Sequence, residues 1–304
     1  YNNASGDGKL WFLDAKDGTV LKTLSTGVGS AASPSGLAQF SAFTKDLTNY
    51  LAEQIYAGDL EGNFWRFDIS DANSANWKVE KMATLTSPSG TAQPVTTAPQ
   101  IEIDITNGID RWVFVGAGKL LHENDLADTA VQTLYAFRDG TTAKPAAIAT
   151  AKSRSDLISV TDADGLKSRP DKGWYDDLPT SPTGQRIIVA PQAALSIVAY
   201  LATYPSTDPC ATGLPATLYA REFARGNSLL LDTGGAIMES IDLPDGGVGL
   251  DIISLEKDSS SGSNDPNLVI RVEGTDKSKE GTIVRLKNPV LLGAHRMSWR
   301  LIGD

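Results

Sequence analysis

Oxygen-bearing side chains gather in glycine-containing loops at three places, and loops of this kind are where proteins hold calcium. Residues 3–8 alternate asparagine, serine and aspartate before a glycine, and Asp14 stands at the twelfth position of that stretch. Because residues 10–15 already alternate as a strand, the pattern favours an ordinary hairpin turn over a calcium loop. The acidic loops at 162–165 and 258–265 are looser, and we expect them to be solvated.

Nucleophilic catalysis has few candidates. Cys210 is the single cysteine, so no internal disulfide can form, and the only histidines are His122 and His295. A cysteine nucleophile needs a nearby base, so a free thiol in a loop is the favoured interpretation. There is no Gly-x-Ser-x-Gly elbow, no histidine pair at zinc spacing, and no helix after the glycine pair at 115–118. Carboxylates are plentiful, so a glycosidase pair stays open, although no two of them stand out.

A recurring phrase indicates which elements would position such side chains. Each copy has small or polar residues, then an alternating run with an aromatic or β-branched residue near its centre. Alternation after a turn dipeptide such as Asp-Gly or Glu-Gly predicts a strand leaving a tight hairpin. The central residues lie 54 to 84 positions apart, which is typical of a β-propeller with long insertions in some blades. The copies occupy residues 7–14, 61–68, 131–138, 215–222 and 280–287.

The first four copies centre on the aromatic residues Trp11, Trp65, Tyr135 and Tyr219. Rings exposed in a row would stack on sugars, which is one interpretation of this set. At equivalent positions of successive blades, we expect these rings to pack between the blades as core instead.

The turn signals predict a half-blade followed by roughly four blades, and no amphipathic helix of a dozen residues. We expect an insertion with a helical turn at 120–130 and an irregular, functional or mobile loop at 152–185. Strands that follow strands do not fit a doubly wound α/β fold. The expected strands are residues 10–15, 20–25, 37–44, 53–60, 64–69, 77–85, 95–105, 111–116, 132–138, 146–151, 186–190, 197–202, 217–223, 228–232, 250–255, 268–273, 282–286 and 296–302, with an Asn-Gly turn at 107–108.

Length, composition and net charge limit the kinds of protein that this sequence can encode. With 304 residues, 41% of them hydrophobic, residues 1–304 can bury a large core, and this size fits one large all-β domain as well as two small ones. No run of about eighteen apolar residues exists, so we expect no membrane span. A net charge of −10 argues against nucleic acid as a partner, because phosphate binding needs a basic surface. Tyr1 begins inside a blade pattern, so we expect further blades upstream of it.

Five stretches carry a family resemblance. Residues 55–68, which read Ile-Tyr-Ala-Gly-Asp-Leu-Glu-Gly-Asn-Phe-Trp-Arg-Phe-Asp, are the most specific of them. The others are residues 121–140, 173–179 with 185–192, 208–210 with 218–220, and 296–300. In this order they resemble the C-terminal domain of the PilY-type proteins, the type IV pilus biogenesis and tip-adhesin family. The resemblance covers nearly the whole chain.

The resemblance implies a modified β-propeller, seven-bladed in the family, at the end of a much larger protein on the cell surface, the pilus tip or the outer membrane. It implies no catalysis. Members of the family prime pilus assembly together with minor pilins, oppose retraction, and support twitching motility and virulence. They also adhere to host or abiotic surface receptors. Two other classes stay open. Strand phrases such as residues 13–18 also occur in quinoprotein-like dehydrogenases, which hold a quinone, calcium and a catalytic aspartate, and a carbohydrate-binding propeller would also suit adhesion.

At the family's calcium loop, this sequence departs from the pattern. In the family, an Asp/Asn-rich loop with a central Asp-Gly precedes the Tyr-Ala-Gly-Asp stretch, binds calcium and governs extension against retraction. Residues 45–53 keep oxygen donors at Asp46, Asn49 and Glu53, but Tyr50 stands at the glycine position, and lysine and leucine side chains replace other ligands. We therefore expect no tight calcium binding here, and no catalytic, cofactor-binding or metal-binding residues.

Overall fold

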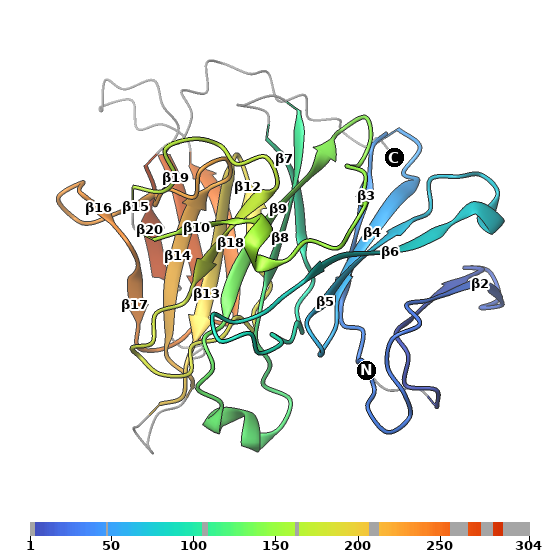
Figure 1. The fold of residues 1–304 in the computed structure, drawn as a ribbon. Coiled ribbons are helices and arrows are strands. Elements are labelled where there is room, and N and C mark those ends of the chain that lie inside the picture. Colours follow the sequence, from blue (N-terminus) through green and yellow to red (C-terminus); the bar gives the residue numbers. More distant parts are fainter. Residues whose placement is uncertain are drawn as a thin grey trace.

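The structure is a computed structural model of the 304-residue chain, and it shows a row of β-sheets that follow one another along the sequence (Figure 1). In the view of Figure 1 the row runs from the blue hairpin at the right to the orange strands at the left. The described residues are 4–46, 48–104, 109–161, 164–206, 213–255, 267–274 and 282–287. Their helical elements are the short 3-10 helices η1 (Ser74–Asn76), η2 (Glu123–Ala127) and η3 (Arg154–Asp156).

The strands described in these ranges form four larger sheets and two hairpins. Sheet I has the order β3 (Phe40–Thr44), β4 (Ala52–Gly58), β5 (Asn63–Asp68), β6 (Lys78–Thr84). Sheet II has the order β7 (Gln100–Asp104), β8 (Asp110–Gly116), β9 (Thr133–Thr141), β11 (Gly173–Asp177), β10 (Ile158–Val160). Sheet III has the order β12 (Gln192–Ala194), β13 (Ile197–Thr203), β14 (Ala216–Glu222), β17 (Ile241–Leu243), and sheet IV the order β18 (Gly249–Leu255), β19 (Asn267–Glu273), β20 (Thr282–Arg285). The hairpins are β1 (Lys9–Leu13) with β2 (Val20–Ser25), and β15 (Leu230–Leu231) with β16 (Ile237–Met238).

The first strands of the four sheets contact one another in sequence. Strand β3 lies against β7, β7 against β12, and β12 against β18. Propeller blades repeat radially in this way around a common channel. Within each sheet the neighbouring strands are antiparallel, except that β10 runs parallel to β11.

A hydrophobic core fills each space between neighbouring sheets, and one strand serves two cores. In β8, Val113 and Val115 pack toward sheet I. The alternate residues Trp112 and Phe114 pack toward sheet III. A strand that is covered on both faces reads as a continuous apolar run, as in β13, where every residue is buried. Further cores join the β1–β2 hairpin to sheet I, and sheet III to sheet IV.

Several sequence expectations are confirmed by these elements. The described residues are all-β apart from the 3-10 turns, β2 coincides with the predicted strand at 20–25, and the insertion at 120–130 contains η2. Trp65, Tyr135 and Tyr219 are 4%, 1% and 3% exposed, as expected for residues of the core between sheets. The turn at 107–108, the loop at 258–265 and the strand at 296–302 lie outside the described residues.

Two strand predictions are wrong. The alanine-rich residues 146–151 form no strand, and small side chains of this kind have weak strand propensity. Strand β9 pairs instead with β11, which comes from the region 152–185 that we expected to be irregular. A Cβ on Gly173 would lie 2.0 Å from the Ala136 carbonyl oxygen, so a glycine is needed where β11 meets β9. Residues 186–190 are also not a strand, because only Arg186 forms a bridge, with Thr203.

The expectation for Trp11 is also wrong, since its side chain is 49% exposed. The β1–β2 hairpin packs Leu10 and Leu24 against sheet I. Trp11 lies on the opposite face of the hairpin, together with the exposed Leu13. In a two-stranded hairpin with only one face covered, side chains of the other face stay in solvent.

Candidate functional site

The turn between β3 and β4 uses its side-chain oxygens to bind its own backbone. Asp46 Oδ1 accepts hydrogen bonds from the Thr48 N–H at 2.8 Å and the Thr48 hydroxyl at 2.6 Å. These bonds hold the pKa of Asp46 below its usual value. Asn49 Oδ1 accepts a hydrogen bond from the Leu51 N–H at 2.9 Å. Both side chains thus form Asx turns, a structural role for two of the expected calcium donors.

Tyr50 gives this turn an unusual backbone. Its φ is +56°, in the left-handed region that residues other than glycine rarely adopt, and its side chain is 77% exposed. The position where the family resemblance implied a glycine therefore keeps the backbone conformation that a glycine adopts without strain.

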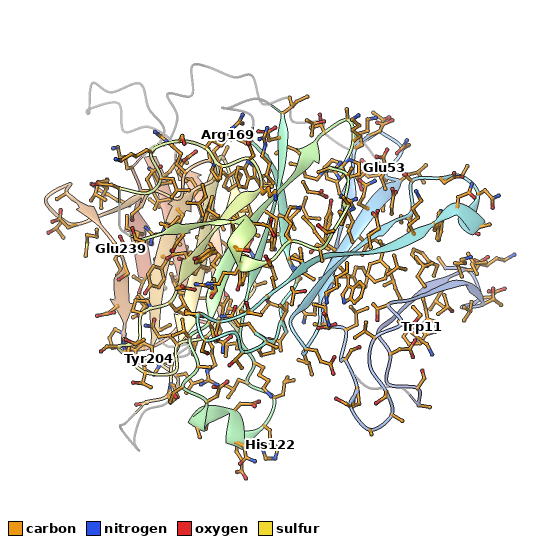
Figure 2. All side chains as sticks on the ribbon, viewed as in Figure 1. Trp11, Glu53, His122, Arg169, Tyr204 and Glu239 are labelled. Atoms are coloured by element: carbon orange, nitrogen blue, oxygen red, sulfur yellow. The ribbon has the colours of Figure 1, made fainter. Side chains whose placement is uncertain are left out.

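Two of the three expected calcium donors in this turn have a side-chain oxygen engaged with the backbone. Calcium takes about six to eight oxygen ligands, and here Asp46 and Asn49 each use a side-chain oxygen to accept backbone N–H bonds. Figure 2 shows Glu53, the third expected donor, beyond the turn on β4. In the described ranges, no three His, Cys, Asp or Glu side chains come together in a group that could hold a metal.

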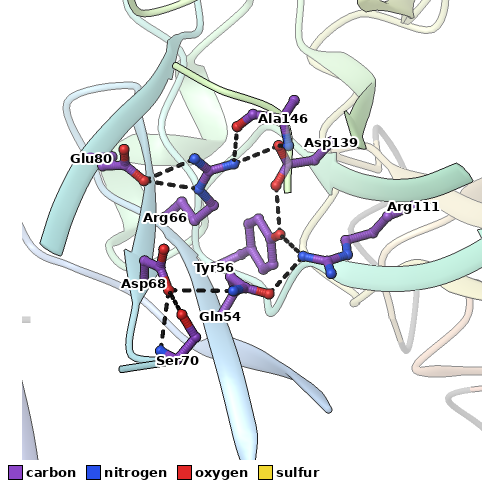
Figure 3. Close-up of polar contacts among 9 residues, drawn as sticks. All are labelled: Gln54, Tyr56, Arg66, Asp68, Ser70, Glu80, Arg111, Asp139 and Ala146. Carbon is purple, nitrogen blue, oxygen red and sulfur yellow. Dashed lines mark hydrogen bonds and ion pairs between the residues drawn. The ribbon is translucent and has the colours of Figure 1, made fainter. Parts of the chain in front are cut away.

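The strands that follow this turn, β4 and β5, contribute side chains to a buried ionic network that links sheet I to sheet II (Figure 3). We call it the Asp139 network. The Tyr56 hydroxyl donates to Asp139 Oδ2 at 2.6 Å, and Arg66 Nη1 donates to Asp139 Oδ1 at 2.6 Å and to the Ala146 carbonyl at 2.8 Å. Tyr56 and Arg66 are cross-strand partners in sheet I, whereas Asp139 belongs to β9. The network therefore ties two sheets together through one carboxylate.

The Arg66 guanidinium holds a second carboxylate at the edge of sheet I. Its Nε and Nη2 donate to Glu80 Oε2 at 3.1 and 2.8 Å. The side chains of Arg66 and Asp139 are 3% and 0% exposed, whereas that of Glu80 is 25% exposed. Burial opposes the charged form of Arg66, but Asp139 and Glu80 outweigh it and raise the pKa of Arg66. Arg66 is therefore a permanent cation between a fully buried anion and a partly solvated one.

Arg111 extends the network from strand β8. Its Nη1 donates to Gln54 Oε1 at 2.8 Å and to the Tyr56 hydroxyl at 3.1 Å. Its guanidinium carbon lies 3.6 Å from the centre of the Phe43 ring, a cation–π contact. Burial and the charge of Asp139 raise the pKa of Tyr56, so this phenol stays a neutral donor between Arg111 and Asp139.

A second network of the same chemistry joins sheets II and III. In this Asp176 network, the Tyr200 hydroxyl donates to Asp176 of β11, and Arg221 Nε donates to the same carboxylate at 2.8 Å. Arg221 also donates to Glu239, whose side chain is 43% exposed. Each network thus has a tyrosine and an arginine around one buried aspartate of an adjacent sheet, with a glutamate nearer solvent.

The comparisons with known proteins agree with this fold. The family model described as the PilY1 beta-propeller domain matches residues 1–161. The chain belongs to this family. The resemblance seen in the sequence is thereby confirmed, and with it the all-β propeller fold. The number of blades stays a prediction.

Curated relatives of the PilY1 family lie at 24–29% identity. A type IV pilus biogenesis factor PilY1 homolog of Xylella fastidiosa is 29% identical over 280 residues, which cover 84% of this chain and 21% of the relative. Type IV pilus biogenesis factor PilY1 of Pseudomonas aeruginosa is 27% identical, over 70% of this chain and 22% of the relative. The chain therefore spans about a fifth of the length of these relatives.

Among solved structures, the crystal structure of the Pseudomonas aeruginosa PilY1 C-terminal domain matches with a TM-score of 0.69 and 19% identity. The match covers 95% of this chain and 67% of that domain. At this identity the likeness concerns the fold alone.

Sequence reasoning missed both ionic networks. Tyr56 and Arg66 stand inside the stretch that carries the family resemblance, and Arg66 interrupts an otherwise aromatic strand. A charged residue in a strand that is buried on both faces requires a partner of opposite charge. The position of Arg66 was therefore the one signal in the sequence that indicated such a network. The partner, Asp139, is 73 residues away, and only the fold brings it close. The candidates for nucleophilic catalysis take no part in these networks as described. His122 caps η2, and Cys210 and His295 lie outside the described residues.

Proposed function

We propose that this chain is a non-enzymatic domain of a type IV pilus biogenesis factor, one that promotes pilus assembly and extension and opposes retraction. The observation that supports this most directly is the similarity to pilus biogenesis factors over 84% of the chain. The fold match over 95% of the chain to a PilY1 C-terminal domain supports the architecture of such a domain. Because the chain spans only about a fifth of those relatives, the role of the whole protein is part of the proposal.

The partners that follow from this role are minor pilins at the pilus tip, and host or abiotic surface receptors for adhesion. Its place would be the cell surface, on the pilus tip or attached to the outer membrane. No helix in the described part of the chain is long and apolar enough to cross a membrane. The net charge of −10 favours protein partners with basic surfaces over nucleic acid.

The test is deletion of the parent gene, scored for surface pili and twitching motility with and without the retraction motor. We expect pili to be lost when the motor is present and to return in part when it is absent. A strain that carries a full-length protein with an unrelated propeller in place of this domain separates the domain's role from that of the rest. Normal piliation in both backgrounds would contradict the proposal.

For calcium, we propose that the turn at Asp46 does not bind the ion tightly. Titration of the domain with calcium, followed by calorimetry, should show no saturable heat in the micromolar range, because Asp46 and Asn49 already accept backbone hydrogen bonds. Asn49→Ala is the control, and it should leave the titration unchanged. Micromolar binding that disappears in Asn49→Ala would show that the turn reorganises around the ion.

A further inference from the structure

A pocket of about 430 Å³ lies at one end of the domain, away from both ionic networks. Three parts of the chain line it: residues 126–129 at the end of η2, residues 182–184, and residues 204–206 with 215, which lie next to the ends of β13 and β14. Figure 2 labels Tyr204 and His122 at this lower end of the molecule. The side chains important for its chemistry are Leu126, Asp128, Tyr204 and Pro205.

A buried arginine holds the insertion in place. Arg186 is 4% exposed, and it donates to the backbone carbonyl oxygens of Lys119 at 3.2 Å and Asp128 at 2.8 Å, and to that of Asp125. Its Nε donates to the Gly184 carbonyl at 3.0 Å. Carbonyl groups of one loop that converge on a single guanidinium fix the path of that loop.

The side chain of Asp125 fixes the same insertion from within. Asp125 Oδ2 accepts hydrogen bonds from the N–H groups of Leu121 at 2.8 Å and His122 at 3.0 Å. In spite of this internal order, Leu121 and Leu126 are 51% and 42% exposed. A loop that is fixed from inside and presents apolar side chains outward is preorganised for binding, because little ordering entropy remains to be lost.

A carboxylate lines the pocket. Asp128 is the one acidic or basic side chain among the described residues that line it. Asp128 Oδ1 accepts a hydrogen bond from the Ala130 N–H at 2.9 Å, and no partner of Oδ2 is found in the described part of the chain. Burial and the nearby charge of Asp242 raise the pKa of Tyr204, so its hydroxyl stays neutral. A ligand in the pocket therefore meets one available carboxylate oxygen and an aromatic ring.

Two cations lie near this carboxylate, but in the described part of the chain neither donates a hydrogen bond to Asp128 Oδ2. Lys119 forms an ion pair with Asp125 at 3.2 Å. Arg186 is attracted by the charges of Asp128 and Asp125, but it is almost fully buried beneath the wall at Gly184, and its N–H groups donate to backbone carbonyl oxygens. An incoming charge at the mouth of the pocket is closest to Asp128.

We propose that this pocket binds the side chain of a lysine or arginine presented by a partner protein. Such a side chain has a long apolar stem and a charged head, which suit an apolar wall of Leu126 and Pro205 that ends at a carboxylate. The ring of Tyr204 adds an attraction for the cation. The chain's net charge of −10 steers a basic partner toward it over longer distances. This proposal rests on the pocket alone and does not depend on the pilus role.

The experiment is an NMR titration of the chain with N-acetyl-lysine N-methylamide, compared with the norleucine analogue, which has a neutral apolar side chain. We expect saturable shifts in the amide signals of residues 126–129, 184 and 204. Binding should weaken by about fivefold with the norleucine analogue, the size expected for a partly solvated ion pair. Asp128→Asn should give the same loss with the lysine probe, since asparagine keeps the bond to Ala130.

The matched control is Glu123→Gln, which removes a charge from the exposed side of the same insertion. Glu123 does not line the pocket, so binding of the lysine probe should stay within about twofold of the unchanged chain. The proposal would be overturned by equal binding of the two probes, by full binding in Asp128→Asn, or by no shifts at these residues. A dispersed spectrum of Asp128→Asn shows that a loss of binding is not a loss of fold.

Discussion

Replacing Asp139 with asparagine will destabilise the domain by about 3–5 kcal/mol, because the change leaves a buried arginine without its main counter-charge. Asp139 is fully buried and accepts bonds from Tyr56 and Arg66 of the neighbouring sheet. Asparagine fills the same space, so the loss reports charge and not volume. Unfolding of the domain in guanidinium chloride, followed by tryptophan fluorescence, measures this loss of stability. The denaturant concentration at the midpoint should fall, while the dependence of the unfolding free energy on denaturant stays constant.

The control for this change is Glu80→Gln, which removes the other carboxylate of the same arginine. Because the Glu80 side chain is 25% exposed, water replaces part of the lost interaction, and we expect a loss of about 1 kcal/mol or less. The double variant with Arg66→Met and Asp139→Asn should be more stable than the sum of the single losses predicts, since neither member of the Arg66–Asp139 pair is then left without the other. Equal losses for Asp139→Asn and Glu80→Gln would contradict a special role of the buried carboxylate.

The two networks have a common physical role between sheets that are also joined by large apolar cores. Hydrophobic contact is not directional, so packed sheets have several orientations of similar energy. A buried aspartate that must meet both a tyrosine and an arginine is satisfied in only one orientation. We infer that Asp139 and Asp176 set how neighbouring sheets are oriented, a role in specificity more than in net stability.

The sequence predicted those parts of the fold that depend on local pattern. Alternation and turn dipeptides located β2 and β5, because these signals act within a few residues. They did not locate β11, whose place in sheet II depends on the close approach of Gly173 to Ala136, 37 positions earlier in the chain. Nor could they identify Trp11 as exposed, since that depends on which face of a two-stranded hairpin is covered.

For the candidate site, the sequence indicated which residue types are present, but it could not predict how their side chains are arranged. It indicated that the turn at Asp46 has too few suitable ligands for calcium, and the structure adds that Asp46 and Asn49 already bind the backbone. The positive φ of Tyr50 could not be anticipated from a residue type that rarely adopts it. The pocket beside Tyr204 could not be predicted from the sequence either, because it is formed by three segments that only the fold brings together.

Alkaline unfolding is the second large effect, and it depends on tyrosines buried between the sheets. Burial raises the pKa of Tyr135 from 10.0 to about 12, and burial also raises the pKa values of Tyr56, Tyr200 and Tyr219. In the unfolded chain these phenols ionise near their ordinary value. A pKa that is higher in the folded state gives stability that is complete below pH 10 and is lost as the pH rises through 12. We therefore expect cooperative unfolding in this window, in which the tyrosinate absorbance contributed by these four phenols appears together with the loss of near-ultraviolet circular dichroism.

Tyr135→Phe separates this effect from a general alkaline instability. The single proton of the Tyr135 hydroxyl is shared between two acceptors, the Thr86 carbonyl oxygen at 2.9 Å and Gln93 Oε1, so the phenylalanine variant should be less stable near neutral pH by about 1–2 kcal/mol. Each unit of pKa shift is worth about 1.4 kcal/mol, so ionisation of Tyr135 alone removes about 2–3 kcal/mol from the unchanged domain at pH 12. The two stability curves must then converge above pH 10 and cross before pH 12. Parallel curves, or tyrosinate absorbance that reaches the value for all eight tyrosines without loss of structure, would show that burial does not hold these phenols neutral.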